Sequence, residues 1–184
     1  MKINQLIQSL YLTAIISTVA IVVSAQQRTD TKEMDCPMMK TNGGPNVDNK
    51  NHLDRVMKNG EKAMGFSQTA TTHHFLIMKD GGAIQVEVND PKDTENRDKI
   101  RMHLAEIAKE FQDGIFTTPF AVHSQVPPGV PVMDELKAEI KYTYEETDHG
   151  ARVRITTTDP KALAAIHDFL KFQIEEHQTG DPTK

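Results

Sequence analysis

The stretch "TTHHFLIMKDGGAIQVEV", residues 71–88, decides the fold of this chain. Apolar and polar residues alternate along it, and Asp80-Gly81 near its middle is typical of a two-residue hairpin turn. That turn would place His74 opposite Glu87 and gather the larger apolar side chains on one face. The face then carries His73, Phe75, Ile77, Ile84, Val86 and Val88. Because the two faces differ in polarity, the stretch predicts a half-buried antiparallel hairpin with a specified register.

An amphipathic helix is predicted directly after this hairpin. Its apolar residues recur at the spacing i, i+4, i+7, i+8 and i+11, which places them on one side of a helix. They are Ile100, Leu104, Ile107, Ala108 and Phe111. Gly114 follows this stripe and is expected to end the helix.

The same order of elements recurs later in the chain: a strand, a turn with Gly150, a second strand and a helix. Asp159-Pro160 lies 69 residues after Asp90-Pro91 and is expected to cap the second helix and begin its first turn. The apolar stripe of that helix is Leu163, Ile166, Leu170 and Ile174. We therefore predict a duplicated ββα unit, at about 72–114 and 139–178. The two units would form a four-stranded antiparallel sheet with helices on one face, an α+β fold.

The N-terminus has the layout of a secretory signal peptide over residues 1–25. Lys2 precedes an apolar run from about Leu10 to Val23, and small residues lead to a cleavage site after Ala25. The run is shorter than the roughly 20 residues of a spanning helix, so a cleaved signal is favoured over an uncleaved anchor. The protein is thus predicted to be exported, to the periplasm or outside the cell, with no membrane attachment after cleavage.

The mature chain is predicted to have three parts. A polar leader (26–50) precedes a single α+β domain (51–178) and a short tail (179–184).

Three shorter elements are also predicted within the domain. They are a helix over 51–59 that ends at Gly60, a brief strand at 120–122 in a Pro-rich connection, and a short helix near 133–138.

Charge and cysteine content narrow the partners. Lys2 is the only charged residue of the signal, so the formal charge of −5 becomes −6 in the mature chain. A mildly acidic chain without a basic patch is a poor candidate for binding nucleic acid. Cys36 is the single cysteine, so no internal disulfide can form.

Four histidines are predicted to point inward, on the core face of the first strand or on the apolar sides of the two helices. They are His73, His103, His167 and His177. Neutral imidazole suits copper, zinc, nickel and iron, so this set is a candidate site for a transition metal, copper or zinc, or for a haem-like ligand. The alternative is that each ring only packs at the edge of the core, because no metal-ligand spacing motif is present.

The leader segment "MDCPMMK" is a weaker candidate metal site. Its sulfur ligands Cys36, Met38 and Met39, together with Met34, are of the soft kind that favours Cu(I). The alternative is an unpaired cysteine beside methionines that have no binding role.

Three functions follow from these observations. The first is an exported binding module for a transition metal or haem-like ligand. The second is a homodimeric structural or protein-interaction domain whose histidines only pack. The third is an enzyme on a small exported substrate, resting on His74 and Glu87 as an acid–base pair. Because the chain has no nucleotide-binding, nucleophile or zinc-protease motif, binding is favoured over catalysis.

The segments "KAMGFSQTATTHHFLIMKDGGAIQVEVND", "VPPGVPVM" and "AIHDFLKFQIEEHQTGD" resemble a group of small exported bacterial proteins that share the pattern MGF…TTHHF…PPGVP…EEH. The resemblance covers about residues 61–182 and includes His73, His74, His167 and His177. It implies an exported bacterial protein and carries no particular activity with it.

Overall fold

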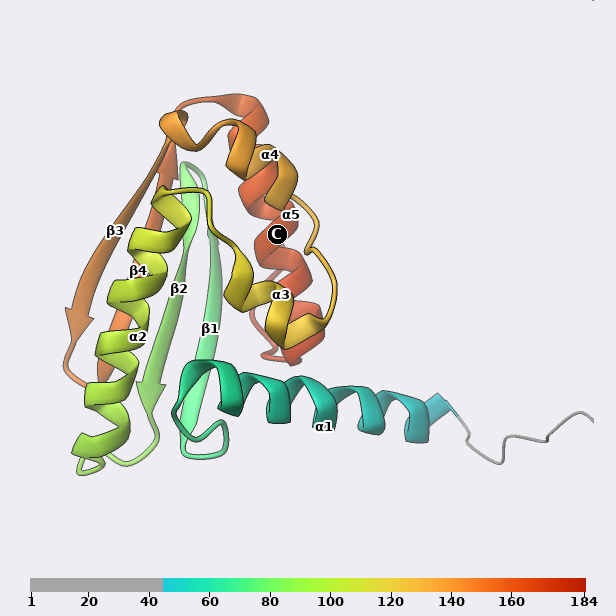
Figure 1. Ribbon diagram of the computed structural model, residues 1–184, viewed down its shortest axis with the longest axis vertical. Helices are drawn as coiled ribbons and strands as arrows, with labels where there is room; N and C mark the ends of the chain where they lie inside the picture. The colour runs from blue at the N-terminus through green and yellow to red at the C-terminus, as the bar shows by residue number, and fades with distance from the viewer. Residues whose placement is uncertain (1–44) are drawn as a thin grey trace, which may run out of the picture. The chain divides into compact units, whose positions relative to one another are not determined.

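The computed structural model describes residues 45–184, which form five α-helices and one four-stranded antiparallel sheet (Figure 1). In chain order the elements are α1 (Pro45–Met64), β1 (Thr71–Met78), β2 (Gly81–Val88), α2 (Thr94–Gln112), α3 (Thr117–His123), α4 (Val130–Glu135), the 3-10 helix η1 (Lys137–Glu139), β3 (Ile140–Thr147), β4 (Gly150–Thr157) and α5 (Pro160–His177). The predicted α+β class and the antiparallel four-stranded sheet are confirmed.

The strand order β1-β2-β4-β3 joins the two hairpins through β2 and β4. The helices lie on one face of the sheet, and the long helix that follows each hairpin packs mainly on the other hairpin. Helix α2 lies against β3 and β4, whereas α5 lies against β1 and β2 (Figure 1). Each ββα segment therefore covers the other's strands. Their origin by duplication stays a prediction.

The register of the first hairpin differs from the prediction by two residues. Lys79 and Asp80 form the turn, so Gly81 pairs with Met78, and His74 faces Gln85 instead of Glu87. A shift of two keeps every side chain on its predicted face, because strand side chains alternate with period two. The core-facing set is therefore unchanged.

Gly81, which suggested the turn, has to be a glycine because β4 lies too close for a side chain. A Cβ on Gly81 would lie 2.1 Å from the carbonyl oxygen of Ile155 in β4, and one on Gly150 would lie 2.0 Å from that of Val86 in β2. Each hairpin thus begins its second strand with a glycine where β2 and β4 approach closely. In the second hairpin Glu145 faces Arg152, as predicted.

Helix α1 is longer than the predicted 51–59. It begins inside the predicted leader at Pro45 and continues through Gly60. The helix ends at Gly65, whose φ of +77° is the left-handed conformation that glycine adopts readily. The earlier part of the leader, 26–44, lies outside the described residues.

The Pro-rich connection contains helix α3 where a strand was predicted at 120–122. The apolar run there is too short for its periodicity to distinguish the two. Its C-cap, Ser124, is left-handed with φ of +57°, and the Nδ2 of Asn59 in α1 donates to the carbonyl of Val122 at 3.1 Å. The short helix predicted near 133–138 is present as α4 and η1.

The predicted apolar stripes form the core between the helices and the sheet. All five stripe residues of α2 are buried. In α5 the stripe is buried except for the half-buried Leu163, and Asp159 caps the helix by accepting from the backbone N–H groups of Lys161 and Ala162. Within residues 45–184 no helix is long and apolar enough to cross a membrane.

Candidate functional site

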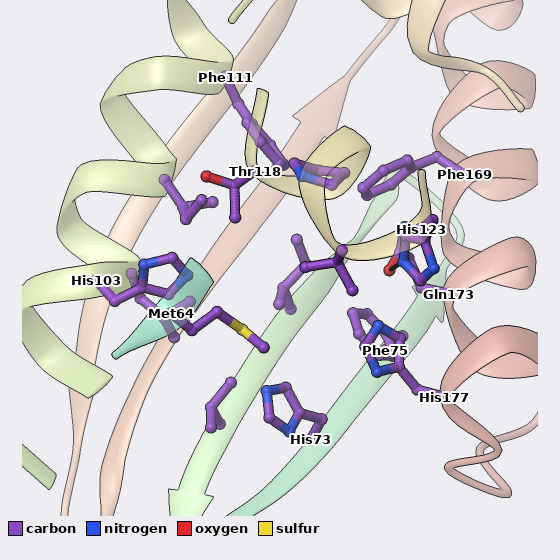
Figure 2. A pocket seen from close by; sticks show the side chains of 16 residues that line it. Met64, His73, Phe75, His103, Phe111, Thr118, His123, Phe169, Gln173 and His177 are labelled. Carbon is purple, nitrogen blue, oxygen red and sulfur yellow. Dashed lines mark hydrogen bonds between the residues drawn. The ribbon is translucent and has the colours of Figure 1, made fainter. Parts of the chain in front are cut away.

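A cavity of about 60 Å³ lies between the sheet and helices α2, α3 and α5 (Figure 2). Its wall consists of Met64, His73, Phe75, Ile84, Val86, His103, Leu104, Ile107, Phe111, Thr118, Pro119, Val122, His123, Phe169, Gln173 and His177. No Asp, Glu, Lys or Arg of the described chain is among them. The cavity holds roughly four water molecules or an organic molecule of similar size.

Four histidines reach this cavity from four different elements. His73 comes from the inward face of β1, His103 from α2, His123 from the last turn of α3 and His177 from the last turn of α5. Figure 2 shows them on different sides of the cavity, with His103 across from His123 and His177. The rings therefore surround a space and do not point at one centre.

Aromatic contacts hold these rings in place. The rings of His73 and His177 stack, with centroids 5.9 Å apart and planes inclined by 13°. His123 meets His177 edge to face at 5.0 Å. The ring centroid of Phe66 lies 5.8 Å from those of His73 and His103. Such aromatic pairs are attractive beyond the area that they bury, so these contacts help to position the rings.

Burial makes the cavity histidines neutral. It lowers the pKa of His73 to about 4 and that of His177 to about 3, and the charges of neighbouring histidines add to both shifts. Burial alone lowers the pKa of His103 to about 4. Near neutral pH each of the three rings therefore offers one N–H donor and one lone pair.

Three polar atoms of the wall have no hydrogen-bond partner within residues 45–184. They are Nε2 of His73, Nδ1 of His123 and Nε2 of Gln173. A buried polar atom without a partner costs about 1–3 kcal/mol, which a bound molecule with hydrogen-bonding groups would recover. The cavity is thus apolar over most of its wall and offers hydrogen bonds at a few points, as small-molecule sites do.

A second, polar pocket adjoins the cavity beside His103. It is lined by three cavity residues, His103, Ile107 and Thr118, together with Glu106 and Glu110. Burial and the neighbouring Glu106 raise the pKa of Glu110 above its ordinary value.

His167 was predicted to join the other inward histidines, but it does not line the cavity. Its Nε2 lies 2.9 Å from the carbonyl oxygen of Met78 and 3.1 Å from that of Gly81, and it donates to them at the β1–β2 turn. His167 therefore ties α5 to the first hairpin, which is a packing role.

The described residues contain no group of three His, Cys, Asp or Glu side chains arranged to hold a metal ion. Coordination by three of the cavity histidines would require their rings to turn. Cys36, Met38 and Met39 lie outside the described residues. Copper or zinc binding stays a prediction.

The acid–base pair of His74 and Glu87 is not formed, because Glu87 faces Thr72 in the observed register. The Nδ1 of His74 instead lies 3.0 Å from Oδ1 of Asp181, and Oδ2 of Asp181 accepts from the backbone N–H of Phe75 at 2.9 Å. His74 thus binds the C-terminal tail to the free edge of β1.

Sequence reasoning missed three polar residues of the wall, Thr118, His123 and Gln173. Thr118 and His123 lie in the Pro-rich connection, where no periodicity marks an inward face. Gln173 precedes His177 by four residues on α5, a spacing that places both on one face, so this residue could have been found.

Comparisons of the chain with protein-family models, with curated proteins and with solved structures find no match in any of the three. The cavity itself is therefore the basis for a proposed function.

Proposed function

We propose that this protein is an exported binding module that holds a small, uncharged and mostly apolar organic molecule in the histidine-lined cavity. The observation that carries the proposal is the wall itself: an apolar cavity with three unpartnered polar atoms, on His73, His123 and Gln173, and no charged side chain among the described residues. The signal-like N-terminus supports export.

The charge of the wall argues for an uncharged ligand. Moving an ion into an apolar site costs several kcal/mol unless an opposite charge meets it. The cavity has neither a carboxylate for a cation nor a permanent cation for an anion, and burial keeps its histidines neutral. An uncharged molecule avoids this cost.

The size of the cavity sets the affinity to expect. A molecule of four non-hydrogen atoms gains at most about 6 kcal/mol at the ceiling of about 1.5 kcal/mol per atom. Propan-2-ol, which has this size, is therefore expected to bind with a Kd between tens of micromolar and several millimolar.

The test is an NMR titration of the isotope-labelled mature protein with propan-2-ol. Saturable shifts are expected at the Gln173 side-chain amide and at the His73 and His177 rings. Gln173→Leu should weaken binding about tenfold or more, whereas Gln125→Leu, at an exposed site, should not change it. Shifts that never saturate, or that are equal in both variants, would overturn the proposal.

A transition metal is the second candidate ligand. In its favour, four imidazoles and the thioether of Met64 line the same cavity, and imidazole binds transition metals in its neutral form. Calorimetric titration of the mature protein with Zn²⁺ and Cu⁺ tests it. One ion bound per chain, lost in His177→Leu and kept in His149→Gln, would support metal binding. The absence of stoichiometric binding of either ion would discard it.

A further inference from the structure

A row of polar side chains runs from the surface of α1 to the cavity. Nη2 of Arg55 lies 2.9 Å from Nδ1 of His52, and Nε2 of His52 lies 2.8 Å from Oε2 of Glu176 on α5. The same oxygen lies 3.5 Å from Nδ1 of the fully buried His123, a nitrogen that has no hydrogen bond within residues 45–184. Nε2 of His123 lies 3.0 Å from the side-chain amide of Gln173.

Arg55, at the outer end of this row of side chains, determines which atom donates in each hydrogen bond. Arg55 can only donate, so Nδ1 of His52 accepts and Nε2 of His52 carries the proton given to Glu176. An ionised Glu176 can only accept, so it demands a proton on each nitrogen that faces it. Nδ1 of His123 is therefore the protonated nitrogen of that ring, since a bare nitrogen there would direct its lone pair at a carboxylate.

Neutrality of His123 completes the assignment. Burial lowers the pKa of His123 below its ordinary value, against the opposing effects of Gln173 and Glu176. A neutral ring with its proton on Nδ1 has a lone pair on Nε2, and that lone pair needs a donor. Within residues 45–184 the hydrogen-bond partner of Nε2 is the Gln173 side chain, so the NH₂ group of its amide must supply the donor.

The amide of Gln173 then has a required orientation. Its oxygen lies nearest to His123 in the structure and its nitrogen is unpartnered. The oxygen and the NH₂ group have nearly the same shape, so a half-turn of the amide gives His123 its donor with little change in packing. The half-turn moves the amide oxygen, an acceptor, to the position of the unpartnered nitrogen, and because Gln173 lines the cavity we expect this oxygen to be open to a ligand there.

We propose that the chain Arg55–His52–Glu176–His123 presents the Gln173 carbonyl to the cavity, so that the site selects molecules with an O–H or N–H group over molecules that only accept hydrogen bonds. This inference rests on the proposed binding function and names its ligand class: alcohols, phenols and N–H heterocycles are favoured over ketones, aldehydes and ethers. At Gln173 an acceptor-only ligand would bring its oxygen against the amide oxygen, so it could accept only from a histidine ring and would leave the Gln173 oxygen without a donor.

The tautomer of His123 is measured without any ligand. Long-range ¹H–¹⁵N correlation spectra of the mature protein at neutral pH should show the proton on Nδ1 and a bare Nε2. In Glu176→Gln the new amide can donate as well as accept, so the form protonated on Nε2 should appear. Glu175→Gln, at the exposed neighbouring position, is the matched control and should leave the tautomer unchanged. A His123 protonated on Nε2 in the unaltered protein would overturn the inference.

Ligand selection is measured with propan-2-ol and acetone, which share a carbon skeleton and differ in the donor. Propan-2-ol should bind the unaltered protein at least about tenfold more tightly, and Glu176→Gln should shrink this ratio while Glu175→Gln keeps it. Equal binding of the two probes would overturn the donor rule and leave the proposed function standing. If neither probe binds, the proposed function fails and the ligand class fails with it.

Discussion

Mild acid should destabilise this protein through its buried cavity histidines. The pKa of His73 and of His103 is about 4, and that of His177 is about 3, against about 6.5 for the same rings in the unfolded chain. A lowered pKa means that the unfolded state binds protons first as the pH falls below 6.5. The stability that these groups contribute is present above pH 6.5 and is lost between there and about pH 4.

The magnitude follows from proton linkage. Between pH 7.5 and pH 5.5 each histidine with these pKa values lowers the free energy of unfolding by about 1.3 kcal/mol. The three together give about 4 kcal/mol as an upper value. Because solvent still reaches part of each ring, we expect a loss of about 2–4 kcal/mol. The lowered pKa of His123 acts in the same direction.

The assay is urea denaturation of the mature protein at pH 7.5 and 5.5, followed by circular dichroism. His73→Leu should remove about a third of the pH-dependent loss, because one of the three groups is gone. His149→Gln, in the exposed β3–β4 turn, should keep the full loss. If the free energy of unfolding of the unaltered protein falls by less than about 1 kcal/mol between these pH values, burial does not have the proposed effect. The same holds if His73→Leu shows as large a fall as the unaltered protein.

Three further substitutions test how the fold is held together. Gly129 has φ of +82° and a Cβ there would lie 2.1 Å from the carbonyl oxygen of Ala165, so Gly129→Ala should lower the free energy of unfolding by at least about 2 kcal/mol in urea denaturation. Asp181→Ala removes the acceptor for the N–H of Phe75; it should cost about 1–2 kcal/mol and speed proteolysis of the C-terminal tail, and unchanged cleavage would contradict the tail's attachment. Asp159→Ala removes the cap of α5 and should lower the thermal midpoint, corresponding to about 1 kcal/mol.

The predicted core and the observed core agree because burial of a stripe is a local property. In α2 all five predicted residues are buried, and the inward face of the first hairpin has the predicted members even though its register moved by two residues. A two-residue slip is invisible to a period-two pattern, so alternation alone could not place the turn. The close approach of β4 at Gly81 decides it.

The candidate site was only partly predictable for a related reason. His73, His103 and His177 lie on inward faces that periodicity reveals, and all three line the cavity. His167 has the same kind of position on α5, yet it meets the carbonyl groups of a turn. Which inward histidines line the same cavity depends on the angle at which α5 crosses β1 and β2. The apolar pattern of the helix does not predict that angle.

The sequence by itself determined the order of strands and helices in the two ββα segments, the inward faces and the cap of α5, because these depend on residues within a few positions of each other. The tertiary structure alone decided the hairpin register, the crossing of each helix onto the other hairpin, and the helical form of α3. It also brought His123 and Gln173 to the cavity wall. Those features depend on contacts between segments far apart in the chain, where packing and hydrogen bonding across elements outweigh local preference.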